Sequence, residues 1–297
     1  MFFDGLQKSG FDKRLVEASL MNNAGLLLKS KHSGGDDSFA ESVFAADITG
    51  LSDVSSYSNV KIDSTGAQIL ASGYAGVTED LTDSDGNGIA VSSDNSPCKL
   101  LTINPTGFGT LSSIVIRMSS SAAGMFQYPD QLLLYCDDVL VSESDEVVSA
   151  GSGINVDITF AFESIELDPN KGYDVYFKSR NPAERRIKSA TITVTPIVYT
   201  SGIVILNEIM LQSGHSRTAF YVYSSGSAPD VMVKLGDGSY ESVAERISKQ
   251  AVSQTGAACT ARRYECEFLP GTYESITIKI EMNAADIVVF GCFGAIL

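Results

Sequence analysis

The segment INVDITF, residues 154–160, alternates apolar and polar side chains along most of its length. The segment ATITVT, residues 190–195, shows the same period of two. Successive side chains of a β-strand point to opposite faces of the sheet, so this alternation is typical of an antiparallel strand with one face buried and the other in water. These two segments predict an all-β fold.

Further strands are predicted on both sides of these segments. LSSIVIRM, residues 111–118, is rich in the β-branched residues that favour strands. Apolar runs at residues 131–136 and 138–141 meet at a tight corner. Similar short runs continue toward the C-terminus: residues 219–223, 231–235, 275–280 and 287–290. Residues 241–250 are the exception, because their pattern allows one or two helical turns.

The chain of 297 residues is about twice as long as a usual domain. We expect two β-sandwich domains of jelly-roll or immunoglobulin-like type, at residues 41–200 and 201–297, after an N-terminal arm at residues 1–40 that contains a short helix. A weak internal repeat supports two domains. Pro169 and Tyr173 precede one predicted strand, and Pro270 and Tyr273 precede another. A tyrosine packed over such a turn is typical of sandwich corners.

The N-terminal arm differs from the rest of the chain in its apolar pattern and in its charge. Phe11, Leu15 and Ala18 recur at helical spacing and predict an apolar stripe. Residues 1–34 have a net charge of +2, whereas the rest of the chain has −17. We therefore expect the stripe to dock on a neighbouring subunit. Packing of the stripe on the chain's own body is the alternative that the sequence leaves open.

The net charge of −15 restricts the partners of the protein. Residues 35–97 contain eleven acidic residues against Lys61 alone, and such a field repels phosphate backbones. We therefore expect no nucleic-acid partner. No apolar stretch is long enough to span a membrane, and the N-terminus lacks the pattern of a signal peptide. We expect no membrane partner and synthesis in a host cytoplasm.

The five cysteines are interpreted as reduced thiols. Cys98, Cys136 and Cys292 lie beside apolar residues, as small core side chains do. Cys259 and Cys266 are spaced so that a hairpin would bring them together, and the sequence leaves their pairing open.

A candidate calcium loop lies at residues 83–94. Asp83, Asp85 and Asn87 alternate before Gly88, and Asp94 ends the twelve-residue loop. Hard oxygen ligands on alternate residues around a glycine are the pattern of an EF-hand loop, although that loop usually ends in glutamate. The same residues are common in hairpin turns. The sequence thus offers Asp83, Asp85, Asn87 and Asp94 as ligands for Ca²⁺ and predicts no other cofactor.

Catalysis is disfavoured by the residue types present. The two histidines, His32 and His215, lie in no recognisable nucleophile or metal motif, so we predict a protein that is not an enzyme and has no catalytic residues. Binding of a glycan receptor fits a β-sandwich. The chain has no tryptophan to stack on a sugar, which leaves that role to tyrosines such as Tyr74, Tyr128, Tyr221 and Tyr223.

Taken as a whole, the sequence resembles virion proteins of tailed bacteriophages. The resemblance lies in the arm at residues 1–31, the Gly/Ser-rich strand pattern, the acidic body and the apolar C-terminal strand through residues 291–297. It implies a structural role in a tail, baseplate, collar or head decoration, with host attachment as a further role and with copies of itself and other virion proteins as partners. A secreted or cell-surface carbohydrate-binding adhesin is the second hypothesis. A glycan-degrading enzyme on a jelly-roll scaffold is the third.

Overall fold

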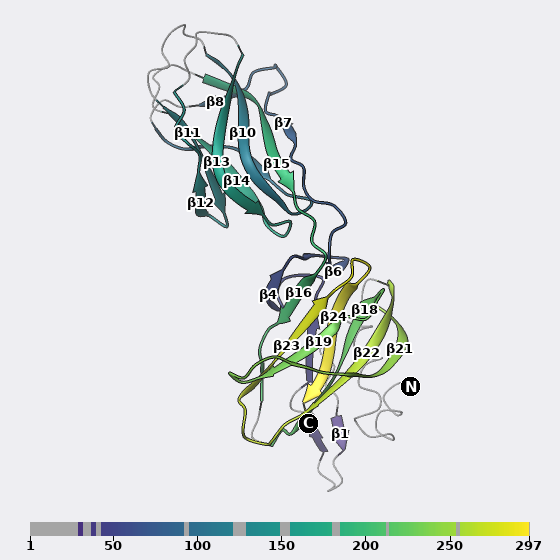
Figure 1. Cartoon of the computed structure of the whole chain (residues 1–297). Coiled ribbons are helices and arrows are strands. Elements are labelled where there is room, and N and C mark those ends of the chain that lie inside the picture. The colour runs from purple at the N-terminus through teal and green to yellow at the C-terminus, as the bar shows by residue number, and fades with distance from the viewer. Residues whose placement is uncertain are drawn as a thin grey trace. The chain divides into compact units, whose positions relative to one another are not determined.

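The computed structural model describes residues 29–31, 37–39, 43–91, 95–120, 129–148, 155–179, 185–211, 214–253 and 256–296. Within these residues the chain forms antiparallel sheets, and none of them is in a helix, so the predicted all-β fold class is confirmed. The chain divides into two compact units (Figure 1). Unit 2 contains residues 71–198, and unit 1 contains residues 1–70 together with residues 199–297.

Unit 2 is built from a four-stranded and a five-stranded sheet. The four-stranded sheet has the order β12-β11-β14-β9, and the five-stranded sheet has the order β13-β10-β15-β7, with β8 also paired to β15. The strands are β7 (Thr78–Asp80), β8 (Ile89–Val91), β9 (Cys98–Ile103), β10 (Gly109–Ser120), β11 (Asp130–Cys136), β12 (Val139–Glu143), β13 (Val156–Leu167), β14 (Tyr173–Ser179) and β15 (Arg185–Pro196).

The strand pairs of unit 2 are nested within one another. β11 pairs with β12, β10 with β13, β9 with β14, and β8 with β15, all antiparallel. The chain therefore behaves as one long hairpin whose two arms wind together through both sheets. Residues 156–160 of the first predicted alternating segment and all of the second, residues 190–195, lie in the five-stranded sheet, in β13 and β15.

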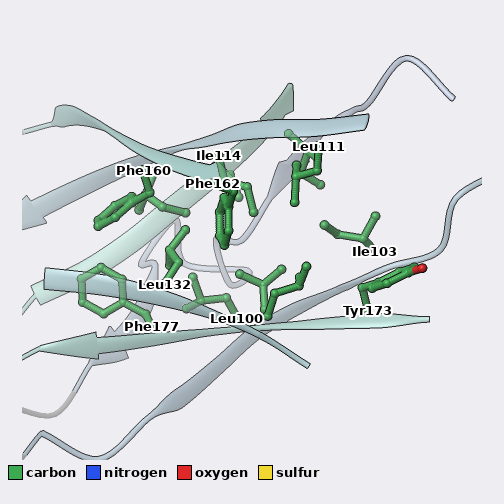
Figure 2. Packing of buried hydrophobic residues seen from close by; sticks show 14 of the residues in the cluster. Leu100, Ile103, Leu111, Ile114, Leu132, Phe160, Phe162, Tyr173 and Phe177 are labelled. Carbon is green, nitrogen blue, oxygen red and sulfur yellow. The ribbon is translucent and has the colours of Figure 1, made fainter. Parts of the chain in front are cut away.

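The core of unit 2 lies between its two sheets. Figure 2 shows Phe160 and Phe162 of β13 on one side and Leu132 and Phe177 of the four-stranded sheet on the other. The rings of Phe160 and Phe177 meet edge to face, with centroids 6.0 Å apart. Along β13 the buried positions alternate with exposed ones, so this strand buries one face only.

Unit 1 is built from a six-stranded and a seven-stranded sheet, with a separate pair of short strands, β1 and β2. The six-stranded sheet has the order β20-β19-β23-β16-β4 with β17 beside β23, and the seven-stranded sheet has the order β21-β22-β18-β24-β6-β5 with β3 beside β24. The strands are β1 (Lys29–Lys31), β2 (Asp37–Phe39), β3 (Val43–Asp47), β4 (Val54–Ser58), β5 (Lys61–Asp63), β6 (Gly66–Gln68), β16 (Gly202–Leu206), β17 (Ile209–Met210), β18 (Arg217–Ser225), β19 (Asp230–Leu235), β20 (Glu241–Ser242), β21 (Glu245–Val252), β22 (Ala258–Glu267), β23 (Ser275–Met282) and β24 (Val288–Ile296).

Unit 1 repeats the nested order of unit 2. β19 pairs with β20, β18 with β22, β16 with β23, and both β3 and β6 with β24. Its inner core again receives residues from both sheets, including Phe220 of β18 and Ile278 of β23. The two units thus share one strand order, and unit 2 is inserted in the chain between β6 and β16.

The units divide the chain differently from the expected domains at residues 41–200 and 201–297. Val43–Asp47 and Gly66–Gln68 pair with Val288–Ile296, so these early strands belong with the C-terminal part of the chain. The expectation took neighbours in sequence to be neighbours in space, and local periodicity contains no information about pairing over such a distance.

Two local predictions have different outcomes. The helical turns allowed for residues 241–250 are wrong, because these residues form β20 and the first part of β21. β21 is an almost fully exposed edge strand, and its pairing with β22 supplies the backbone hydrogen bonds that a helix would otherwise provide. The helix expected in the arm at residues 1–40 falls on residues 1–28, which lie outside the described residues.

The repeated pattern of a proline followed by a tyrosine lies at equivalent junctions in the two units. Tyr173 follows the link between β13 and β14, and Tyr273 lies between β22 and β23. The Tyr173 ring is buried, and its hydroxyl accepts a hydrogen bond of 2.9 Å from the backbone N–H of Asp168. Tyr273 is 37% exposed instead. The predicted tyrosine corner is therefore formed in unit 2 only.

Candidate functional site

An exposed apolar strand borders the four-stranded sheet of unit 2. β12 is the last strand in the order of that sheet, and among the described residues no strand is paired with its other edge, although β13 of the second sheet lies close to it. The side chains of Val139, Leu140 and Val141 are 63%, 41% and 44% exposed. We name Val139, Leu140 and Val141 the apolar edge. Exposed edges of this kind present unpaired backbone groups beside apolar side chains and favour pairing with another chain.

A two-residue turn positions the apolar edge. Asp137 and Asp138 both have positive φ angles, of 51° and 61°, and they join Cys136 to its pairing partner Val139. Two left-handed residues give the backbone twist that a tight hairpin needs, and aspartate tolerates that conformation. The strand register shifts near Val141, as at a β-bulge. The turn also places two carboxylates at one end of the apolar edge.

The equivalent edge of unit 1 has the opposite character. β20 takes the place of β12 in the shared strand order, yet it contains only Glu241 and Ser242. Short, charged edge strands are a common means of preventing contact between sheets of different molecules. One of the two equivalent edges is therefore protected, and the other is longer and carries three apolar residues in succession.

A cavity of about 620 Å³ lies in unit 1 near β20. Its lining combines apolar residues with Glu241, Arg246, Glu265 and Glu267. Leu269 and Tyr273, which are 72% and 37% exposed, also contribute to the lining. Charged groups beside a partly exposed aromatic ring make this cavity suitable for a polar ligand with apolar faces, such as a sugar.

The cysteine thiols do not form a reactive centre in this cavity or elsewhere in the described residues. Burial raises the pKa of the Cys266 thiol, and the carboxylates of Glu241 and Glu267 add to that effect. Cys266 and Cys259 both lie on β22, where they face opposite sides of the sheet, so the hairpin that the sequence allowed between them does not exist. All five cysteines are free, as expected.

The candidate calcium residues form a hydrogen-bonded turn. Oδ1 of Asp83 accepts hydrogen bonds from the backbone N–H groups of Asp85 and Asn87, at 3.1 and 2.7 Å. Thr82 and Gly88 close the turn as a β-bridge. Asp94, the fourth proposed ligand, lies outside the described residues. Among the residues that the structure describes, no three His, Cys, Asp or Glu side chains are grouped to hold a metal ion. Calcium binding stays a prediction.

A buried ion pair lies at one end of the core of unit 2. The Arg185 guanidinium contacts the carboxylate of Asp130, and both side chains are almost completely buried. Arg185 begins β15 and Asp130 begins β11, so the pair links the two sheets. Sequence analysis missed this pair, since neither residue stands in a motif and only the fold brings them together.

The predicted docking residues Phe11, Leu15 and Ala18 lie outside the described residues. Tyr221 and Tyr223, considered for sugar binding, are buried within unit 1, and Tyr74 is buried within unit 2. No helix in the described part of the chain is long and apolar enough to cross a membrane.

Comparison with known proteins gives no family for the chain. No family model and no curated protein matches it. The similarity to solved structures is loose. A structure of infectious bursal disease virus, Gx strain, is 12% identical over 77% of this chain and 42% of that chain, with a TM-score of 0.21. Dimeric latent PorU from Porphyromonas gingivalis is 11% identical over 89% of this chain and 23% of that chain, with a TM-score of 0.19. This chain thus spans less than half of either protein, and the low TM-scores support no functional argument.

Proposed function

We propose that the protein is a structural component of a virion, of the tailed-bacteriophage type, that has no catalytic activity and assembles with copies of itself. The single observation that carries this proposal is the apolar edge at Val139–Val141, which stands where unit 1 has a short charged strand. A protein that works as an isolated monomer gains nothing from such an edge and risks aggregation.

The strand order supports the proposal at the level of fold. We propose that each unit is a jelly roll, because nested antiparallel pairs distributed over two sheets are the arrangement expected of that fold. Jelly rolls occur both in viral capsid proteins and in lectins. Since one fold serves many functions, this likeness does not choose between those roles. The apolar edge favours assembly.

The partner at the apolar edge is proposed to be the same strand of a second copy. A two-fold antiparallel pairing centred on Leu140 would place Val139 of each copy opposite Val141 of the other and exclude water from all of them. The same pairing would bring Asp137 opposite Glu143, and like charges weaken such a contact. Association should therefore become stronger as salt screens these carboxylates.

Measurement of mass in solution tests the assembly role. The wild-type protein should associate as its concentration rises, and more so at high salt. Val139→Lys should remove this association, because a lysine on an edge strand prevents pairing. Leu269→Lys makes the same change at an exposed apolar residue of unit 1 and should leave association intact. A wild-type protein that stays monomeric at every concentration and salt level would contradict the proposal.

A carbohydrate-binding adhesin is the second candidate, and the cavity beside Tyr273 favours it. If this cavity binds a sugar, oligosaccharide titration should detect binding that Tyr273→Ala weakens by about tenfold or more, whereas Tyr176→Ala in unit 2 leaves it unchanged. A glycan-degrading enzyme is the third candidate. Turnover of bacterial surface glycans that is lost on changing one carboxylate would favour it and overturn the non-enzymatic proposal.

A further inference from the structure

Two strands of the seven-stranded sheet are buried on both faces. All residues from Thr218 to Ser224 in β18 are buried, and so are those from Val289 to Ile296 in β24. Phe220 points into the core shared with the six-stranded sheet, whereas its neighbour Tyr221 belongs to a separate apolar cluster. Because successive side chains of a strand face opposite sides, this second cluster lies on the outer face of the sheet.

We name this cluster the outer patch. It extends over β22, β18 and β24, which are neighbours in the sheet. Its members are Tyr221, Tyr223, Cys259, Ala261, Phe290, Phe293 and Ala295. Tyr223 and Phe293 are only 2% and 3% exposed. The described hydrophobic residues that pack against the patch, Ala251, Ala257 and Val288, lie in the same sheet or next to it. They border the patch and do not lie over it.

The course of the chain indicates what covers the outer patch. β3 pairs with β24, and Val43 lies opposite Ala295 of the patch. The hairpin of β1 and β2 precedes β3, and its register sets Lys29, which follows residues 1–28, opposite Phe39. The burial of the patch arises within a single chain. Elsewhere in unit 1, the stretches outside the described residues are no longer than five residues. We infer that residues 1–28 of the same chain dock on the outer patch.

The chemistry of the two surfaces fits this inference. The predicted helix around Phe11, Leu15 and Ala18 offers an apolar stripe, and a helix of eleven residues is about 16 Å long. Three neighbouring strands extend over roughly 10 Å from the first axis to the third, so such a helix can cover them. The small side chains of Ala261 and Ala295 allow a close approach between the aromatic rings.

A buried arginine on the same face of the sheet needs a hydrogen-bond acceptor from the segment that covers it. Arg263 faces outward because its neighbour Tyr264 packs in the inner core, and it is only 9% exposed. One of its Nη atoms contacts the carboxylate of Glu265, but its Nε atom has no hydrogen-bond partner within the part of the chain that the structure describes. Asp12, which flanks the apolar stripe, would place a carboxylate on the docked segment near such a group.

Cys259 provides a reporter for this docking. Its thiol is buried in the outer patch, whereas the Cys292 thiol is buried in the inner core. In the wild-type full-length protein, both thiols should react slowly with an alkylating reagent, as followed by mass spectrometry of peptides. Leu15→Asp should raise the labelling rate of Cys259 by roughly tenfold or more while Cys292 stays protected. Val16→Asp makes the same change off the stripe and should leave both rates unchanged.

Three results would overturn the inference. The first is an unchanged Cys259 rate in Leu15→Asp, and the second is an equal rise in Val16→Asp. The third is a wild-type Cys259 that becomes reactive when the protein is diluted to monomers, since a second copy would then supply the cover. If Leu15→Asp also exposes Cys292, the variant has unfolded, and Leu15→Ala replaces it with the same expected contrast. The inference does not depend on the assembly role proposed above, because the two tests use different residues and different measurements.

Discussion

The two units share one strand order but bury their sheets differently. β13 in unit 2 alternates buried and exposed side chains, as expected of a sheet with one face in water. β18 and β22 of unit 1 form a pair that is equivalent to β10 and β13 of unit 2. β18 is buried at every position except its two ends. The difference shows that topology alone does not decide which faces are covered. The docking of residues 1–28 inferred above would account for this difference in unit 1.

Substitutions on opposite faces of one strand give the largest expected contrast. Phe160→Ala in β13 should lower the free energy of unfolding by about 3–5 kcal/mol, whereas Thr159→Ala on the exposed face should change it by less than about 0.5 kcal/mol. In β18, Phe220→Ala and Tyr221→Ala should both cost about 3 kcal/mol or more. Chemical denaturation measures all four. A Tyr221→Ala variant as stable as Thr159→Ala would show that the outer face is open to water.

Removal of the acidic partner of a buried arginine should lower the free energy of unfolding by different amounts in the two units. Asp130→Ala leaves the guanidinium of Arg185 buried without its carboxylate and should cost about 3–5 kcal/mol of unfolding free energy. Glu265→Ala removes the more exposed partner of the buried Arg263 and should cost less, about 1–3 kcal/mol. Thermal unfolding of both variants provides the measurement. Equal losses would mean that the two ion pairs experience similar environments in solution.

The tyrosines at the equivalent corners give a smaller contrast. Tyr173→Phe removes the hydroxyl that accepts the N–H of Asp168 and should cost about 1–3 kcal/mol. Tyr273→Phe should cost less than about 0.5 kcal/mol, because this side chain is far less buried than that of Tyr173. Denaturation midpoints of the two variants at neutral pH test this contrast. A similar loss of stability in both would mean that the hydrogen bond between Tyr173 and Asp168 contributes little to the stability of unit 2.

The same tyrosine predicts a change at alkaline pH. Burial disfavours the phenolate and raises the pKa of Tyr173 to about 12, against about 10 in an unfolded chain. Between these two values the folded state holds a proton that the unfolded state has lost, so stability falls as the pH rises from about 10 to 12. Tyr173→Phe should therefore reduce the slope of stability against pH in this window. An identical slope in the variant would contradict the assigned shift.

Local periodicity predicted strands more successfully than it predicted their environment. Residues 154–160 and 190–195 were recognised because one-sided burial imposes a period of two. The run at Val139–Val141 looks like a buried strand, since three apolar residues in succession usually lie in a core, yet it is an exposed edge. Residues 245–252 have no strand pattern because an exposed edge strand does not require apolar side chains. Tertiary context decides these cases.

The candidate sites show the same limit. The turn at Asp83 was visible from its residue types, but its ligand geometry depends on Asp94 and on the surrounding fold. The ion pair of Arg185 and Asp130 joins residues that are 55 positions apart. The ion pair leaves no local signal, because its strands meet only after folding. The outer patch leaves only the continuous apolar runs of β18 and β24, which indicate burial on both faces but do not identify what covers them.

The insertion of unit 2 between β6 and β16 has a consequence for the order of events during synthesis. Every strand of unit 2 has been made once residue 196 leaves the ribosome, so this unit can fold while translation continues. Unit 1 needs β24, which pairs with β18, β3 and β6 and is the last strand along the chain. β3 and β6 therefore stay unpaired with β24 while more than two hundred residues are synthesised. During that time these strands are accessible to chaperones and to neighbouring chains.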